Sequence, residues 1–362
     1  MSGTLADHGI HPLAETESEA GSVSDFRRVL DHSINLRDLG DVTPRVRQGL
    51  VLRSSQVVSP LQLRKLGVQS IIDLRQAPVA CRVHTHNVSD MFKRWFASVK
   101  LWVQRSLLGR KPVHAMSRKR LLLEQAVLLE SKPCWRCTQA CEDTYGVKAQ
   151  VYHVDLLPGA VSFFIFAALP HYLQAKVLYL VVRKQKPEAL VAAAVADPQV
   201  LGFFKLYKII LERSKTNVAA ALRLLLQDDH LPVLIHCVHG KDRTGLIAML
   251  IYLICRVPRE VIVADYARSE SLLRESREKR ELLDLPVDLT RDQVIASVAS
   301  VMEATLDYLQ QRYGDVDNYL MSAGMEQEEI DGIREKMMPA MSQNALMPQN
   351  GNNSFSNGTN SC

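Results

Sequence analysis

The stretch Val-Leu-Ile-His-Cys-Val-His-Gly-Lys-Asp-Arg-Thr-Gly, residues 233–245, decides the fold of this chain. The short apolar run that precedes its cysteine, residues 232–236, is rich in β-branched side chains and predicts a buried strand. The long apolar run over residues 244–254 predicts a buried helix. Between them lies the 237–243 loop, where the unpaired amides and the dipole of the helix N-terminus stabilise an anion. The sequence therefore predicts an α/β fold with an anion-binding loop between a strand and a helix.

The residue types in and beside the 237–243 loop suit phosphate chemistry. A cysteine at a helix N-terminus beside cations ionises readily, so Cys237 is a candidate thiolate nucleophile. Arg243 offers a planar fork that matches two phosphate oxygens. Gly240 lets the backbone turn its amides inward, and Thr244 has a hydroxyl to donate to the sulfur. We expect His236 to support the loop from behind.

The pair Lys241-Asp242 precedes the arginine. Lys241 would add a positive charge to the pocket and favour highly anionic substrates. Asp242 is a candidate general acid, which would protonate the leaving oxygen and later activate a water molecule. The alternative is that Asp242 only forms an ion pair with Lys241 or with a nearby arginine. The residue types leave both interpretations open.

The loop resembles the His-Cys-x-x-Gly-Lys-Asp-Arg-Thr-Gly signature of the bacterial-type tyrosine phosphatases with lipid phosphatase side activity, part of the cysteine-dependent phosphatase superfamily. Further stretches occur in the order that this family shows. These are Asn-Leu-Arg-Asp-Leu-Gly at 35–40, Gly-Leu-Val-Leu-Arg-Ser-Ser at 49–55, Gly-Val-Gln-Ser-Ile-Ile-Asp-Leu-Arg at 67–75, the segment 257–269, and the segment 302–319.

The resemblance implies a cysteine-phosphatase fold, in which a central, mostly parallel sheet is flanked by helices and the loop follows a central strand. It also implies a reaction through a phosphocysteine intermediate, with no metal and no cofactor. In the family's pattern Cys237 is the nucleophile, Arg243 binds phosphate and Asp242 is the general acid. The substrate-binding set predicted around them comprises His239, Gly240, Lys241, Thr244, Gly245, Asp73 and Arg75.

The sequence does not decide which residue is the general acid, or whether the residues at one strand end bind substrate. Eukaryotic relatives usually carry their acid in a Trp-Pro-Asp loop, which this chain lacks, so Asp155 is the second candidate for the acid. Asp73 and Arg75 end a strand-like run, where open α/β sheets place ligand-facing residues. A structural ion pair is an equal alternative for them. Asp38 and Arg53 are predicted to be structural rather than catalytic.

The predicted organisation is one catalytic domain, residues 25–340, between disordered tails at 1–24 and 341–362. An insertion at about 78–150 separates two expected strands. Within it, residues 91–120 contain nine Lys and Arg, no Asp or Glu, and two tryptophans at helical spacing. This pattern is typical of a helix that docks on an anionic membrane or an acidic partner. The alternative is that its apolar face packs on the catalytic domain.

Other patterns limit the function. Residues 161–182 are interrupted by polar side chains and fit buried domain helices better than a bilayer span. Seven scattered cysteines are no disulfide framework, which favours a reducing, cytoplasmic compartment. Cys134, Cys137 and Cys141 would need His153 to complete a zinc site, and three unligated cysteines are the alternative. The chain carries no nucleotide-binding glycine loop and no nucleic-acid fold signature.

Two functions of different class remain. The first is a phosphatase for phosphotyrosine proteins, with phosphoinositides as a further substrate class and peripheral membrane contact through residues 91–120. The second is a phosphate-binding pseudophosphatase or adaptor without turnover. The presence of Cys237, Arg243, Thr244 and an acid inside the loop favours the enzyme.

Overall fold

The computed structural model of the chain describes residues 33–56, 58–75, 148–183, 185, 187–282 and 296–340. Both predicted tails and the predicted insertion up to residue 147 lie outside the described residues. The same holds for the basic stretch 91–120 and for Cys134, Cys137 and Cys141. The predictions made for those segments therefore stay predictions.

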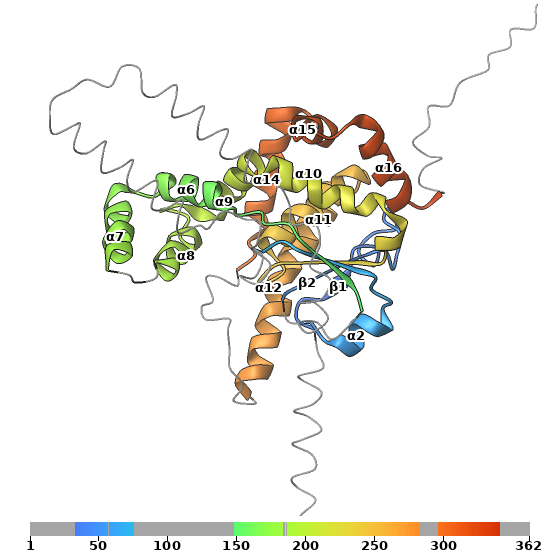
Figure 1. Cartoon of the computed structure of the whole chain (residues 1–362), viewed down its shortest axis with the longest axis horizontal. Helices are drawn as coiled ribbons and strands as arrows, with labels where there is room; N and C mark the ends of the chain where they lie inside the picture. The colour runs from blue at the N-terminus through green and yellow to red at the C-terminus, as the bar shows by residue number, and fades with distance from the viewer. Residues whose placement is uncertain are drawn as a thin grey trace, which may run out of the picture.

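The described chain contains both strands and helices (Figure 1). The strands are β1 (Arg37–Asp38), β2 (Val51–Ser54), β3 (Ser70–Asp73), β4 (Gln150–His153) and β5 (Val233–His236). The helices are α2 (Pro60–Lys65), α6 (Gly159–Ala168), α7 (His171–Val182), α8 (Glu188–Ala196), α9 (Gly202–Arg213), α10 (Lys215–Arg223), α11 (Asp242–Ile254), α12 (Arg259–Leu282), α14 (Ala299–Tyr313), α15 (Val316–Ser322) and α16 (Gln327–Met337). Short 3-10 turns occupy Leu224–Leu226 and Asp228–His230.

The strands form one sheet in the order β1-β2-β5-β3-β4. β1 runs antiparallel to β2, and every other pair is parallel. β5 is the central strand, and its Leu234 pairs with Leu52 on one side and Ile71 on the other. This confirms the predicted α/β fold with a mostly parallel central sheet.

The two faces of the sheet pack against different partners. Alternate side chains of β5, Val233 and Ile235, enter the large core that the helices build on one face. Leu234 points to the other face, where it packs in a smaller core with Leu63 of α2. In Figure 1 the helical mass accordingly lies on one side of the strands, and α2 lies on the other.

The predicted strand and helix on either side of the 237–243 loop are both present. β5 is buried along its whole length, as an apolar strand in a parallel sheet requires. Helix α11 begins at Asp242, two residues before the apolar run starts, and it lies in the large core with side chains buried around its whole circumference. The loop is therefore fixed at both ends by core elements.

Helices α6, α7 and α8 form a lobe beside the main body (Figure 1). The apolar segment 161–182 folds as α6 and α7, with the break at Pro170. In the part of the chain that the structure describes, none of the helices combines the length and the apolar character that crossing a bilayer needs. The expectation that this segment is buried is only half right, because Tyr172 and Tyr179 on α7 are exposed.

Candidate active site

The 237–243 loop lies at the edge of the sheet where the parallel strands end. The segments that follow β2 and β3 contact it through their backbones. The amide of Gln56 donates to the carbonyl of Val238 at 3.0 Å, and the amide of Leu74 donates to the carbonyl of His236 at 2.9 Å. Both contacts hold the loop against the sheet.

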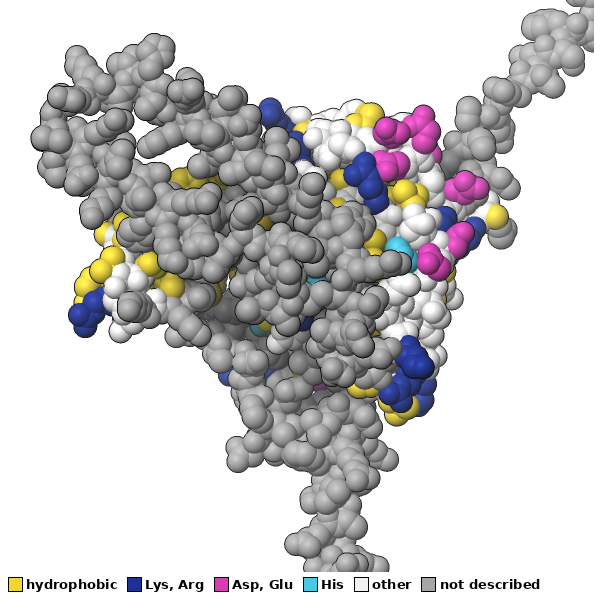
Figure 2. All heavy atoms as spheres, in the orientation of Figure 1, with side chains coloured by type: hydrophobic (Ala, Val, Ile, Leu, Met, Phe, Trp, Pro, Cys, Tyr) yellow, Lys and Arg dark blue, Asp and Glu magenta, His cyan; other side chains and the backbone are white. Residues whose placement is uncertain are grey.

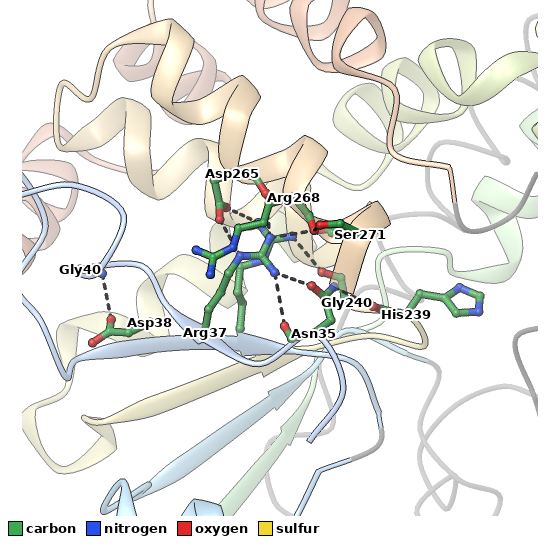
Figure 3. A network of polar contacts seen from close by, with 11 residues as sticks. Asn35, Arg37, Asp38, Gly40, His239, Gly240, Asp265, Arg268 and Ser271 are labelled. Carbon is green, nitrogen blue, oxygen red and sulfur yellow. Dashed lines mark hydrogen bonds and ion pairs between the residues drawn. The ribbon is translucent and has the colours of Figure 1, made fainter. Parts of the chain in front are cut away.

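Side chains take the next carbonyls of the loop. Asn35 Nδ2 donates to the carbonyl of His239 at 3.0 Å, and Arg53 Nη2 donates to the carbonyl of Gly240 at 2.8 Å (Figure 3). The carbonyl of Lys241 accepts from the amide of Gly245 at 2.8 Å, which begins helix α11. Successive loop carbonyls therefore have donors that come from outside the loop.

Several amides of the loop, unlike its carbonyls, have no hydrogen-bond partner in the described backbone. Those of Gly240, Asp242 and Arg243 have no carbonyl acceptor among the described residues. Amides that follow one another around a loop at a helix N-terminus form an anion-binding concavity. With the carbonyls bound from outside, the free amides make the loop a candidate anion-binding site.

A buried ion triad fixes Arg53. Asp265 of α12 accepts from Arg37 Nε and from Arg53 Nη1, each at 2.6 Å, and its side chain is 1 % exposed. Arg37 also donates to Asn35 Oδ1 and to the hydroxyl of Ser269. Strands β1 and β2 and helix α12 thus meet in one polar network directly behind the loop (Figure 3).

The triad keeps its charges. Burial alone would raise the pKa of Asp265, but the charges and hydrogen bonds of Arg53 and Arg37 outweigh it and lower that pKa. Burial and the neighbouring Arg53 lower the pKa of Arg37 to about 10, so Arg37 is still a cation at neutral pH. Two cations and one anion leave a net positive charge behind the loop, which attracts a thiolate or a phosphate.

Gly240 is a position where only glycine fits. Its φ is +72°, and a Cβ built on it would lie 2.2 Å from the carbonyl oxygen of Ser54. The end of β2 therefore approaches the loop backbone more closely than any side chain allows. The sequence predicted an inward turn of the amides here, and the close approach to β2 adds a second reason for the glycine.

The structure places the predicted nucleophile and phosphate ligand at the two ends of the loop. The thiol of Cys237 is free and the residue is buried. Arg243 Nη1 donates to the carbonyl of Leu74 at 3.2 Å, and its other guanidinium nitrogens have no acceptor among the described residues. The buried hydroxyl of Thr244 has no hydrogen-bond partner among the described residues, so the expected bond to the sulfur of Cys237 is not formed.

Asp242 is anchored by one of its oxygens. The hydroxyl of Tyr207 on α9 donates to Asp242 Oδ1 at 2.6 Å, and Lys241 Nζ lies 3.3 Å from the same oxygen. Tyr207 in turn contacts the hydroxyl of Tyr266 at 2.8 Å. Burial and the charge of Asp242 raise the pKa of Tyr207 well above its ordinary value, so it is a permanent donor. The predicted ion pair of Lys241 and Asp242 is therefore present, and the acid role stays a prediction.

Lys241 was predicted to add a positive charge to the pocket, and in the structure its ammonium has partners within the protein. Its side chain is fully buried, and its ammonium donates to the carbonyl of Ala296 at 2.8 Å. The same ammonium lies 3.9 Å from the ring centroid of Phe203 on α9. The ammonium is therefore held by Ala296 and Phe203, and its charge supports Asp242 at 3.3 Å.

Asp73 and Arg75 form the structural ion pair that was one of the two alternatives. Arg75 donates from Nε at 2.8 Å and from Nη2 at 2.7 Å to the two oxygens of Asp73. Burial opposes ionisation of Asp73, but His153 and Arg75 outweigh it and hold its pKa well below the ordinary range. Burial lowers the pKa of His236, whose ring lies 3.1 Å from the carbonyl of Cys237. His236 therefore contacts the first residue of the loop, and its supporting role stays a prediction.

The remaining predicted residues have structural contacts. Asp155 Oδ1 accepts from the amide of Leu157 at 2.8 Å. Asp155 follows strand β4, which β3 separates from β5. Asp38 accepts from the amides of Gly40 and Gly49. A Cβ at Gly245 would lie 3.3 Å from the ring of Tyr266, so this glycine lets α11 approach α12.

Sequence reasoning gave no role to the residues that hold the loop and the acid. These are Asn35, Arg37, Tyr207, Asp265 and Tyr266. The only available signal was that Asn35 and Arg37 lie in the stretch 35–40, and Asp265 and Tyr266 in the segment 257–269, both of which resemble the family. Tyr207 lies outside every such stretch.

Replacing Gly240 with alanine tests the close approach to β2. We expect affinity for inorganic phosphate, measured by calorimetry, to fall by roughly 10- to 100-fold, the value of one hydrogen bond to a charged group. Gly67→Ala is the matched control, because Gly67 has a similar φ of +65° but nothing within 4 Å of the added Cβ. Equal phosphate affinity in the two variants would contradict the argument.

Replacing Asp265 with asparagine tests the ion triad. Two buried cations would lose their anion, so we expect the free energy of unfolding at pH 7 to fall by about 3–5 kcal/mol, measured with urea. Because folding lowers the pKa of Asp265, its charge stabilises the fold at pH values above the unfolded pKa of about 3.9. This stabilisation is lost as pH falls toward the pKa of the folded state. The variant should therefore show a smaller loss of stability below about pH 4. Parental stability at pH 7 would rule the triad out as a support.

Comparison with known proteins identifies the family to which this chain belongs. The model of the tyrosine phosphatase family matches residues 29–339. The triple specificity protein phosphatase PtpB of Mycobacterium tuberculosis is 32% identical over 117 residues, which cover 28% of this chain and 42% of that protein. A tyrosine-protein phosphatase of Nostoc commune is 33% identical over 123 residues, which cover 32% of this chain and 42% of that protein. The chain thus matches less than half the length of each relative. Because the family model spans most of this chain, the chain belongs to the tyrosine phosphatase family.

Proposed function

We propose that the protein is a phosphatase that hydrolyses phosphate monoesters through a phosphocysteine intermediate. The observation that carries this proposal is the backbone of the 237–243 loop, whose carbonyls are bound from outside while amides remain available at its centre. Cys237 begins this loop, and Arg243 ends it with guanidinium nitrogens that lack acceptors among the described residues. Such a loop binds the three oxygens of a phosphate group and leaves the phosphorus next to the sulfur.

The proposed reaction has two steps. In the first, the Cys237 thiolate attacks phosphorus, the bond to the leaving oxygen breaks, and that oxygen takes the proton of the Asp242 carboxyl. In the second, the Asp242 carboxylate takes a proton from water while the water oxygen attacks phosphorus. The sulfur–phosphorus bond then breaks, so that inorganic phosphate leaves and the thiolate is restored. Arg243 and the loop amides stabilise the charge on the phosphate oxygens in both steps.

The geometry favours Asp242 over Asp155 as the acid. Asp242 is the neighbour of Arg243 in the chain, and its side chain is 19% exposed. Tyr207 and Lys241 both engage Oδ1, and Oδ2 has no hydrogen-bond partner among the described residues. A fixed carboxyl with one oxygen left over is suited to hold a transferable proton. Asp155 instead uses an oxygen to cap the turn that follows β4.

For substrates, we propose phosphotyrosine in proteins first and phosphoinositides second. The names of the two relatives describe a tyrosine phosphatase and a triple specificity phosphatase, which supports the first class and leaves room for the second. Peripheral contact of residues 91–120 with anionic membranes belongs to the same proposal. A cytoplasmic, reducing location fits the free thiol of Cys237. The alternative, a phosphate-binding module without turnover, differs only in the absence of product.

Replacing Cys237 with serine tests the nucleophile. We expect turnover of an aryl phosphate to be abolished while affinity for phosphate persists, because the loop amides and Arg243 bind the anion. Vanadate should inhibit the parent protein and chelators should not. Substantial turnover by the serine variant would contradict the mechanism, and a parent protein that binds phosphate but forms no product would support the adaptor.

Replacing Asp242 with asparagine tests the acid. We expect kcat to fall by about 10²–10⁴ for substrates with poor leaving groups, and by less for good ones. Tyr207→Phe should lower kcat by roughly tenfold with the same dependence on the leaving group, since one hydrogen bond to a charged group is lost. Tyr266→Phe is the matched control, because among the described residues its hydroxyl contacts Tyr207 at 2.8 Å and forms no hydrogen bond with Asp242. A leaving-group dependence that appears in Asp155→Asn and not in Asp242→Asn would transfer the role to Asp155.

A further inference from the structure

Helix α7 carries three of the seven exposed large apolar side chains among the described residues. Tyr172, Tyr179 and Val182 are 66%, 60% and 68% exposed. The next large apolar side chain among the described residues, Val298, is 50% exposed. Single exposed apolar residues are ordinary, but three of them on one short helix form a patch that favours a partner.

The exposed side chains follow one line along the helix. Tyr172, Lys176, Tyr179 and Arg183 are spaced by four, three and four residues, which places them on the same face. All four are exposed, so aromatic rings and cations alternate along this outer line. The opposite side of α7 carries Leu173 and Val177, which are 8% and 6% exposed in the large core. The helix is therefore anchored by one side and presents the other.

The charged side chains in and beside α7 in the sequence are all basic. Residues 156–187 contain no Asp or Glu, so the cations of α7 have no acid nearby in the sequence to neutralise them. The lobe of α6, α7 and α8 stands out from the main body in Figure 1. In Figure 2 its visible side chains are mostly hydrophobic, with basic side chains at the outer tip.

We propose that the outer face of α7 docks the protein on an anionic lipid surface. Tyrosine rings favour the headgroup layer, where the apolar ring is buried and the hydroxyl stays hydrated. Lysine and arginine extend their stems along apolar surface and place their charges among lipid phosphates. The alternation of the two residue types suits this layer better than the apolar core of a protein interface, from which charged side chains are depleted. The inference does not depend on turnover at the 237–243 loop.

Sedimentation of the full chain with lipid vesicles tests the proposal. We expect binding to vesicles of phosphatidylcholine and phosphatidylserine in a three-to-one ratio, little binding to phosphatidylcholine alone, and weaker binding as salt rises. Lys176→Gln with Arg183→Gln should weaken binding by roughly fivefold per cation. Tyr172→Ser with Tyr179→Ser should weaken it further. Leu61→Ser with Leu66→Ser on and just after α2 is the matched control, because these leucines are 46% and 43% exposed.

Three outcomes would overturn the proposal. One is vesicle binding that is equal in the α7 variants, the control and the parent, in which case another segment binds the lipid. Another is a lower melting temperature of the tyrosine variant, which would show that the rings pack within the fold. The third is a loss of self-association in that variant, measured by light scattering, which would make the face an interface between copies. Hydrolysis of a small soluble phosphate should be the same in all variants.

Discussion

Arg53 binds the carbonyl of Gly240 from behind the 237–243 loop, and this contact decides which way the loop backbone faces. A buried carbonyl without a donor is costly, so the loop can turn its amides inward only if each carbonyl finds a partner outside. Removing the Arg53 guanidinium from water costs several kcal/mol, and the pair with Asp265 offsets that cost. A neutral donor would satisfy the same carbonyl. It would not add the positive charge that an anionic substrate and a thiolate require behind the loop.

The structure gives a role to the stretches outside the loop that resemble the family: they supply the residues that hold the loop in place. The stretch 35–40 supplies Asn35 and Arg37, the stretch 49–55 supplies Arg53, and the segment 257–269 supplies Asp265. These side chains converge from β1, β2 and α12 on one network (Figure 3). The reacting groups need only the short loop, but the direction of the loop's backbone needs residues from both ends of the chain.

This difference explains what could be predicted from the sequence. The strand, the loop and the helix are contiguous, so residue type and spacing were enough to predict them. The mostly parallel sheet was predicted from the resemblance to the family. Asp265 lies 228 residues from Arg37, and no local pattern connects a charge in one helix with a cation in a distant strand. The contacts of Lys241 were missed for a related reason, because its ammonium meets Phe203 and the carbonyl of Ala296, which are both distant in the sequence. The exposed residues of α7 could not be predicted, because a continuous apolar run does not indicate which side of a helix faces the core.

Different parts of the fold position the two halves of the proposed chemistry. The sheet edge fixes the nucleophile and the phosphate ligand, since β5 leads into Cys237 and the carbonyl of Leu74 after β3 binds Arg243. The helices fix the acid, because Phe203 and Tyr207 lie one turn apart on α9 and contact Lys241 and Asp242. The same helix packs against α6 and α8 of the lobe and against α14 of the main body. A displacement of α9 would therefore change the contacts that hold Lys241 and the proposed acid, Asp242, so the packing of the lobe bears on the proposed acid step.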